Sequence, residues 1–237
     1  MTRFVVSILT FLCASTAFGQ NDGSEQNQTG RPGTFAITNA RIYTVSGPVI
    51  ENGTVIIQNG KITSVGPNVQ IPGGAERIDG RGLQVFPGMI DASTNMGLAE
   101  ITLAVPGSVD LAETGTMNAH TRAILGIHPH SAHINVTRVN GITTVLSRPQ
   151  GGTISGQAAV INLNGSTPEE MAVISDFGLV INFPRVVAGG GFGGGGGGQA
   201  TDFNELVRRR DQAVDDLKKI FRDAQTHLRA REAYTRD

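Results

Sequence analysis

Asn59-Gly60 constrains the fold of this chain most strongly, because it stands between two short runs of β-type residues, Thr54 to Gln58 and Lys61 to Val65. A two-residue turn of type I′ needs positive φ at both central positions, and Asn-Gly supplies both at little steric cost. Apolar residues alternate with others along the first run, so at least one face is buried. With the earlier run Phe35 to Val45, the pattern predicts a small β-sandwich segment over residues 35–86.

The first residues predict a secretory signal peptide over residues 1–19. An apolar stretch from Phe4 to Leu12 is followed by Ala17-Phe18-Gly19, which fits a small-x-small cleavage pattern before Gln20. The stretch is shorter than the roughly 20 apolar residues of a membrane-spanning helix, so an uncleaved anchor is the less favoured alternative. The single cysteine, Cys13, lies in this segment, which leaves no disulfide in the mature chain. We expect an exported protein, periplasmic or secreted.

Charge and composition exclude some classes of partner. The chain carries 19 basic and 20 acidic residues, with a net charge of −1, and so predicts no basic surface for nucleic acid or for an anionic membrane. We expect no nucleic acid and no membrane partner after signal cleavage, while a homo-oligomer stays open. Residues 20–34 are rich in Asn, Gln, Gly and Ser, and this composition predicts a flexible leader.

Further strands and a mobile segment are predicted beyond residue 87. The stretch Arg138 to Leu146 predicts a helix that stops at Asn140-Gly141 and a buried strand after it. Apolar runs also cover Ile154 to Leu163 and Leu179 to Phe183, the second being a candidate third strand. Residues 189–198 are all glycine except Phe192 and predict a mobile loop or linker. A phosphate-binding P-loop is the less favoured alternative, because it requires Lys followed by Ser or Thr after the glycines, and this pair is missing here.

The chain finishes with a predicted helix over residues 202–233. Asp202 is its expected N-cap, with Glu205 placed to complete a capping box. Apolar residues then recur at helical spacing and form a stripe that needs a partner, for which a later part of the fold is the natural candidate: Phe203, Leu206, Val207, Val214, Leu217, Phe221, Ala224 and Leu228.

The run Pro87-Gly88-Met89-Ile90-Asp91 resembles the first barrel strand of the amidohydrolase superfamily, in which such a run is followed by His-x-His. The order of a β-rich segment before this strand is also similar to that family, and in particular to its imidazolonepropionase-like group. The resemblance implies an α/β fold, with a partial (β/α)8 TIM-type barrel preceded by the small β-sandwich segment. A complete barrel takes about 250 residues, so we expect residues 87–237 to form an incomplete one.

The same resemblance implies a hydrolase that acts on carbon–nitrogen bonds, other than peptide bonds, of a small substrate. A zinc-like divalent metal would activate water in such a protein. Ser93 and Asn95 hold the two His positions, however, and hydroxyl and amide oxygens are weak ligands for such a metal. Ser93, Thr94 and Asn95 are instead the candidate substrate-binding residues at the C-terminal face of the barrel, and Asp91 is expected to orient the strand. The alternative function is a catalytically degenerate ligand-binding barrel, and no catalytic residue is assigned.

The histidine cluster and the glycine-rich stretch 151–157 are two other candidate sites. His128, His130 and His133 form the only histidine cluster and are the alternative metal site, but Pro129 opposes helical pairing from His128. An exposed helix start with Ser131 as N-cap is favoured. A serine nucleophile in the glycine-rich stretch 151–157 does not match Gly-x-Ser-x-Gly, so a loop at the active-site face is favoured there.

Overall fold

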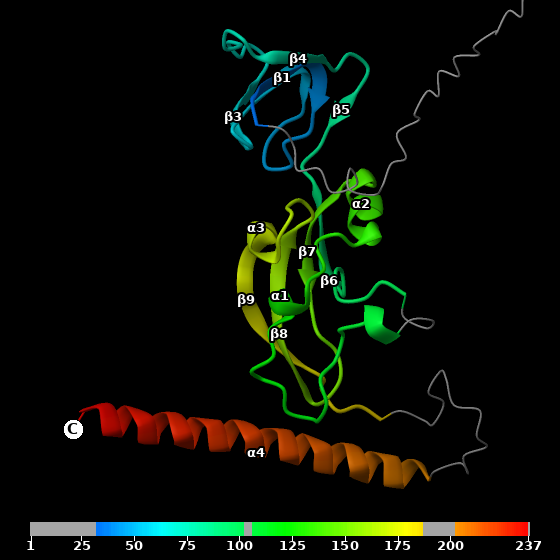
Figure 1. The fold of residues 1–237 in the computed structure, drawn as a ribbon, viewed down its shortest axis with the longest axis vertical. Coiled ribbons are helices and arrows are strands. Elements are labelled where there is room, and N and C mark those ends of the chain that lie inside the picture. Colours follow the sequence, from blue (N-terminus) through cyan, green and yellow to red (C-terminus); the bar gives the residue numbers. More distant parts are fainter. Residues whose placement is uncertain (1–31, 102–105, 187–201, 237) are drawn as a thin grey trace, which may run out of the picture.

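The computed structural model describes residues 32–101, 106–186 and 202–236 (Figure 1). The predicted signal peptide, most of the predicted leader and the glycine-rich stretch 189–198 therefore lie outside the described residues. The described part holds two β-sheets, three short α-helices on the second sheet, and one long helix (Figure 1).

The first sheet is built from the predicted β-rich segment. Its strands are β1 (Thr34–Ile42), β2 (Ile50–Gln58), β3 (Lys61–Gly66), β4 (Glu76–Asp79) and β5 (Gln84–Val85). The turn between β2 and β3 is confirmed, because Asn59 has φ 51° and Gly60 has φ 74°, as a type I′ turn requires.

The prediction of a sandwich for this segment is corrected to one five-stranded mixed sheet in the order β3-β2-β1-β4. β4 and β5 both run parallel to β1 and share its free edge, β4 along residues 35–38 and β5 along residues 41–42. Because both extend the same edge, neither is left to start a second layer. Ala40, Ile42 and Val55 form a small core cluster in this sheet, and Ala36 and Ile56 are also buried.

The second sheet contains β6 (Met89–Thr94), β7 (Ile142–Ser147), β8 (Ile154–Asn162) and β9 (Ala172–Ile181), in that order. β6 and β7 are parallel, as the first two strands of a barrel would be, but β8 is antiparallel to both β7 and β9. The predicted third strand forms the end of β9, which does not neighbour β7. The sheet is thus mixed and open, and the described residues do not close a TIM-type barrel.

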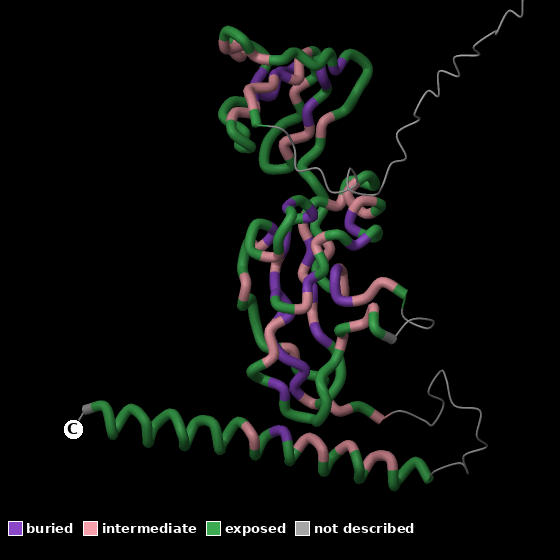
Figure 2. The backbone as a smooth tube through the Cα atoms, viewed as in Figure 1, coloured by how far each residue is buried: buried purple, intermediate pink, exposed green. Residues whose placement is uncertain are grey.

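Three helices cover one face of the second sheet: α1 (Ala123–Gly126), α2 (Ala132–Val139) and α3 (Pro168–Met171). A 3-10 turn, η2 (Pro106–Ser108), lies in the connection before α1. Buried residues from the helices, from β7 and β8 and from the adjoining loops form the main core (Figure 2), namely Leu98, Ala123, Ile124, Ile127, Ile134, Val145, Ala159, Ile161, Leu163 and Met171. Several apolar side chains of β6 and β9 stay outside it and are exposed, including Ile90, Phe177 and Leu179.

Local sequence features set the ends of α2 and the start of β7. Ser131 is the N-cap, and its hydroxyl accepts a hydrogen bond from the backbone N–H of His133 at 3.3 Å. Asn140 ends the helix, and Gly141 follows with φ 90°, as predicted. At the start of β6, Gly88 lies so close to Thr143 of β7 that no side chain fits between them.

The long helix α4 (Phe203–Arg236) confirms the predicted terminal helix but not its capping box. The Glu205 carboxylate pairs with Arg209, while the Asp202 carboxylate accepts from the N–H of Asn204 at 3.2 Å. The helix runs across the end of the second sheet that lies away from the first sheet (Figure 1). Leu217 is its only buried residue among those described, and its second half is exposed (Figure 2). None of the helices in the described segments is long and apolar enough to span a membrane.

Candidate binding site at the ends of β6 and β7

The parallel pairing of β6 and β7 brings two polar strand ends together. Thr94 is paired with Ser147, and the backbone N–H of Arg148 donates to the Thr94 carbonyl at 3.0 Å. The Ser147 hydroxyl is buried and donates to the carbonyl of Met96 at 2.8 Å. Two strands that are far apart in sequence are therefore held in register at their C-terminal ends.

Arg148 contacts the predicted site residue Ser93 directly. Its Nε donates to Ser93 Oγ at 2.8 Å. The arginine side chain is half-buried, and in the described part of the chain no carboxylate lies within ion-pair distance of it. Asp91 has the expected orienting contact, because its Oδ1 accepts from the backbone N–H of Ser93 at 3.0 Å.

Asn95 has different surroundings from Ser93. It lines a hollow of about 350 Å³ with Met96, Ala99, Glu100, His133 and Thr137. His133 is held there by its Nε2, which lies 3.0 Å from the Glu100 carbonyl oxygen. The three predicted residues thus share one strand end, but Ser93 meets Arg148 whereas Asn95 faces the hollow beside α2.

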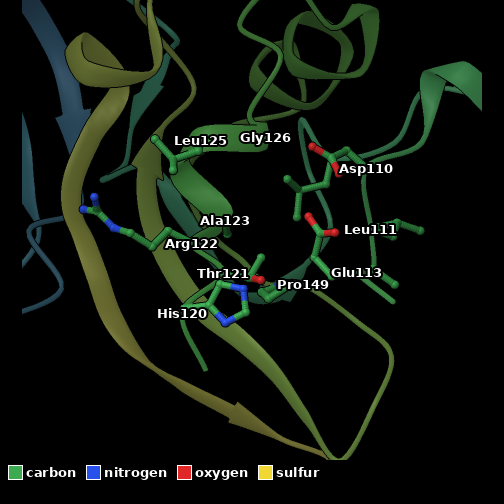
Figure 3. A pocket seen from close by; sticks show the side chains of 12 residues that line it. Asp110, Leu111, Glu113, His120, Thr121, Arg122, Ala123, Leu125, Gly126 and Pro149 are labelled. Atoms are coloured by element: carbon green, nitrogen blue, oxygen red, sulfur yellow. The ribbon is translucent and has the colours of Figure 1, made fainter. Parts of the chain in front are cut away.

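A second hollow, also of about 350 Å³, lies between α1 and the stretch 110–113 (Figure 3). Asp110 and Glu113 lie on one side of the hollow (Figure 3). His120 and Arg122 lie on the other side, in the segment that leads into α1 (Figure 3). The Arg122 guanidinium is not free for a ligand, because its Nε and Nη2 bind the Asp176 carboxylate at 2.6 and 2.8 Å. These hydrogen bonds raise the pKa of Arg122. No spacing in the sequence links Asp110 with His120, so this hollow was not predicted.

The histidine cluster does not form the alternative metal site. The rings of His128 and His130 meet edge to face with centroids 6.0 Å apart, whereas His133 turns to Glu100. Pro129 keeps the first two histidines outside the helix that carries the third, which starts at Ala132. Within the described ranges, no group of three or more His, Cys, Asp or Glu side chains is arranged to hold a metal ion.

The strand end itself does not fit the divalent metal that the amidohydrolase resemblance implies. Ser93 and Asn95 offer weak oxygen ligands in two different environments. The Arg148 guanidinium, bonded to Ser93, places a fixed positive charge where a cation would have to bind, and like charges at such short range repel.

Ser155 has a structural role in place of a nucleophilic one. It is fully buried, and its hydroxyl donates to the Gly151 carbonyl at 2.6 Å and accepts from Asn182 Nδ2 at 2.9 Å. Ser155 lies in β8, so the loop predicted for residues 151–157 ends at Thr153, and the Gly151 contact ties that loop to the start of the strand.

Parts of the chain are similar to known proteins. Residues 34–85 match the NagA composite domain. The fold is similar to a solved amidohydrolase from Thermotoga maritima MSB8, with a TM-score of 0.68 and 22% identity over 86% of this chain and 50% of that one. This chain therefore spans about half the length of that relative.

Two further solved structures are similar over less of the chain. A Bifidobacterium longum protein described as a prolidase has 33% identity and a TM-score of 0.23, over 25% of this chain and 16% of its own. An uncharacterised protein has 25% identity and a TM-score of 0.33, over 48% of this chain and 25% of its own. No curated protein matches the chain. Both matches agree with the amidohydrolase resemblance that the strand motif predicted.

Proposed function

We propose that the protein is an exported hydrolase of the amidohydrolase type, which acts on carbon–nitrogen bonds, other than peptide bonds, of a small substrate. Export to the periplasm or the medium is proposed from the predicted signal peptide over residues 1–19. Because this chain spans half the length of the solved amidohydrolase, the activity is proposed for the whole protein.

The observation that carries the proposal is the parallel β6–β7 pair, which directly follows a sheet of the NagA composite type and ends in Ser93 and Arg148. Active sites of barrels built from parallel strands lie at the C-terminal ends of the strands. These two side chains are therefore suited to bind and orient a substrate. We derive no step through a metal from them, since this strand end does not fit one.

The test is to purify the protein from its complete open reading frame and to measure bound metal and turnover on a panel of lactams, cyclic imides and N-acyl amines. Release of the ring-opened or deacylated product above the rate of the buffer supports the proposal. No turnover on the whole panel, by protein that melts cooperatively, would remove it.

A ligand-binding barrel without catalysis is the second candidate. It is favoured by one observation, the guanidinium that stands where a catalytic cation would bind. Panel compounds that raise the melting temperature without being converted would support this function, and efficient turnover would exclude it.

A further inference from the structure

We propose that Ser93 and Arg148 form a binding site for a carboxylate, so that the small substrate is an anion bound at the C-terminal ends of β6 and β7. The inference rests on the proposed function, because it names the substrate class of the same site.

Hydrogen-bonding capacity at this site is left over after the protein contacts are made. A guanidinium has five N–H donors in a fixed fork, and Ser93 takes only the one on Nε. The terminal nitrogens of Arg148 have no partner in the part of the chain that the structure describes. The Ser93 hydroxyl accepts from Nε and keeps its own proton to donate. Terminal N–H groups and one O–H therefore remain for an acceptor.

The charge of Arg148 has no carboxylate partner among the described residues, although this arginine is half-buried. Arg122 is paired with Asp176, and Arg81 with Asp79. The nearest carboxylate in the strand, that of Asp91, is engaged by the backbone N–H of Ser93. A partly buried charge without a counter-ion is costly, and an incoming carboxylate offsets that cost through charge-assisted hydrogen bonds.

The guanidinium is held before any ligand arrives. The backbone of Arg148 is anchored to Thr94 and its Nε to Ser93, at 3.0 and 2.8 Å. A planar fork that is fixed in this way matches the two oxygens of a carboxylate. One guanidinium balances one negative charge, which favours a carboxylate over a phosphate dianion.

The experiment is isothermal titration of the whole protein with glutarate and, separately, with its uncharged diamide glutaramide. Arg148→Gln, Arg148→Lys and Ser93→Ala are compared with Arg81→Gln, a matched control that removes an arginine in the turn between β4 and β5. We expect glutarate to bind and glutaramide not to bind. Arg148→Gln should weaken glutarate roughly 10- to 100-fold, Arg148→Lys and Ser93→Ala should weaken it less, and Arg81→Gln should leave it unchanged.

Equal affinity for glutarate and glutaramide overturns the inference, as does unchanged glutarate binding in an Arg148→Gln variant that melts like the wild type. Tighter binding of inorganic phosphate than of glutarate overturns the carboxylate assignment. The two proposals fail separately: turnover of neutral lactams with no carboxylate binding leaves the hydrolase and removes this site. Carboxylate binding without turnover of any panel compound supports this site and removes the hydrolase.

Discussion

Replacing Gly88 with alanine should destabilise the second sheet at the point where the chain enters it. A Cβ at this position would lie 2.0 Å from Thr143 Oγ1 and 2.7 Å from Thr143 Cβ. Rotation of the threonine side chain can relieve the first contact but not the second, so β6 and β7 must move apart. Overpacking of this kind costs about 1–3 kcal/mol. A cost of about 2 kcal/mol lowers the melting temperature of a chain of this size by about 4–8 °C.

The assay is thermal and urea unfolding of the purified protein, with Gly178→Ala as the control. Gly178 lies in β9, where an added methyl group would meet no atom within 4 Å, so this variant should melt like the wild type. Thr143→Gly removes the clashing atoms, and the Gly88→Ala/Thr143→Gly pair should recover about 1–2 kcal/mol relative to additive effects. The reasoning would be refuted if Gly88→Ala melted at the same temperature as the wild type, or if the effects of Gly88→Ala and Thr143→Gly were additive in the double variant.

Three further changes test other parts of the fold. Gly60→Ala should cost about 1 kcal/mol by urea unfolding through backbone strain alone, because φ is +74° and no atom lies within 4 Å; an unchanged midpoint would contradict the type I′ turn. Ser155→Ala should lower stability by about 1–3 kcal/mol, since its hydroxyl bonds both Gly151 and Asn182, yet it should leave turnover intact; lost turnover in a folded variant would argue for a catalytic role. Hydrogen bonds from Arg81 and Asn39 lower the pKa of Asp79 from 3.8 to about 2. The resulting stabilisation is therefore present above pH 3.8 and is lost as the pH falls toward 2, and a carboxyl NMR titration of Arg81→Gln should show the pKa rising.

Elements marked by local chemistry were predicted well from the sequence. The β2–β3 hairpin, the end of α2 at Asn140-Gly141 and the Ser131 cap each depend on conformations that few residues adopt or on contacts within a few positions. Such features are fixed by neighbouring residues and do not need the rest of the fold. The predicted capping box did not form, because the Glu205 carboxylate pairs with Arg209, one turn further along the helix.

The pairing of strands was predicted less well, because periodicity indicates a buried strand but not its partner or direction. Leu179 to Phe183 was predicted as the third strand of a parallel barrel, but the strand that pairs with β7 is β8, and only residues 148–153 connect these two strands. A parallel neighbour needs a crossover of about a dozen residues or more, whereas Gly151 and Gly152, with φ 80° and 60°, turn the chain back at once. The length of this connection was therefore the missed indication of an antiparallel strand.

Only one of the two contacting site residues was predicted from the sequence. Ser93 was found from its place at the end of one strand, but Arg148 was missed because nothing near it in sequence marks it as a site residue. Once two strands are taken as parallel neighbours, the residues that directly follow each strand must meet at the same edge of the sheet, and Arg148 directly follows β7. A fixed guanidinium stands at the strand end where the resemblance would place a cation, and the charge that remains there is positive.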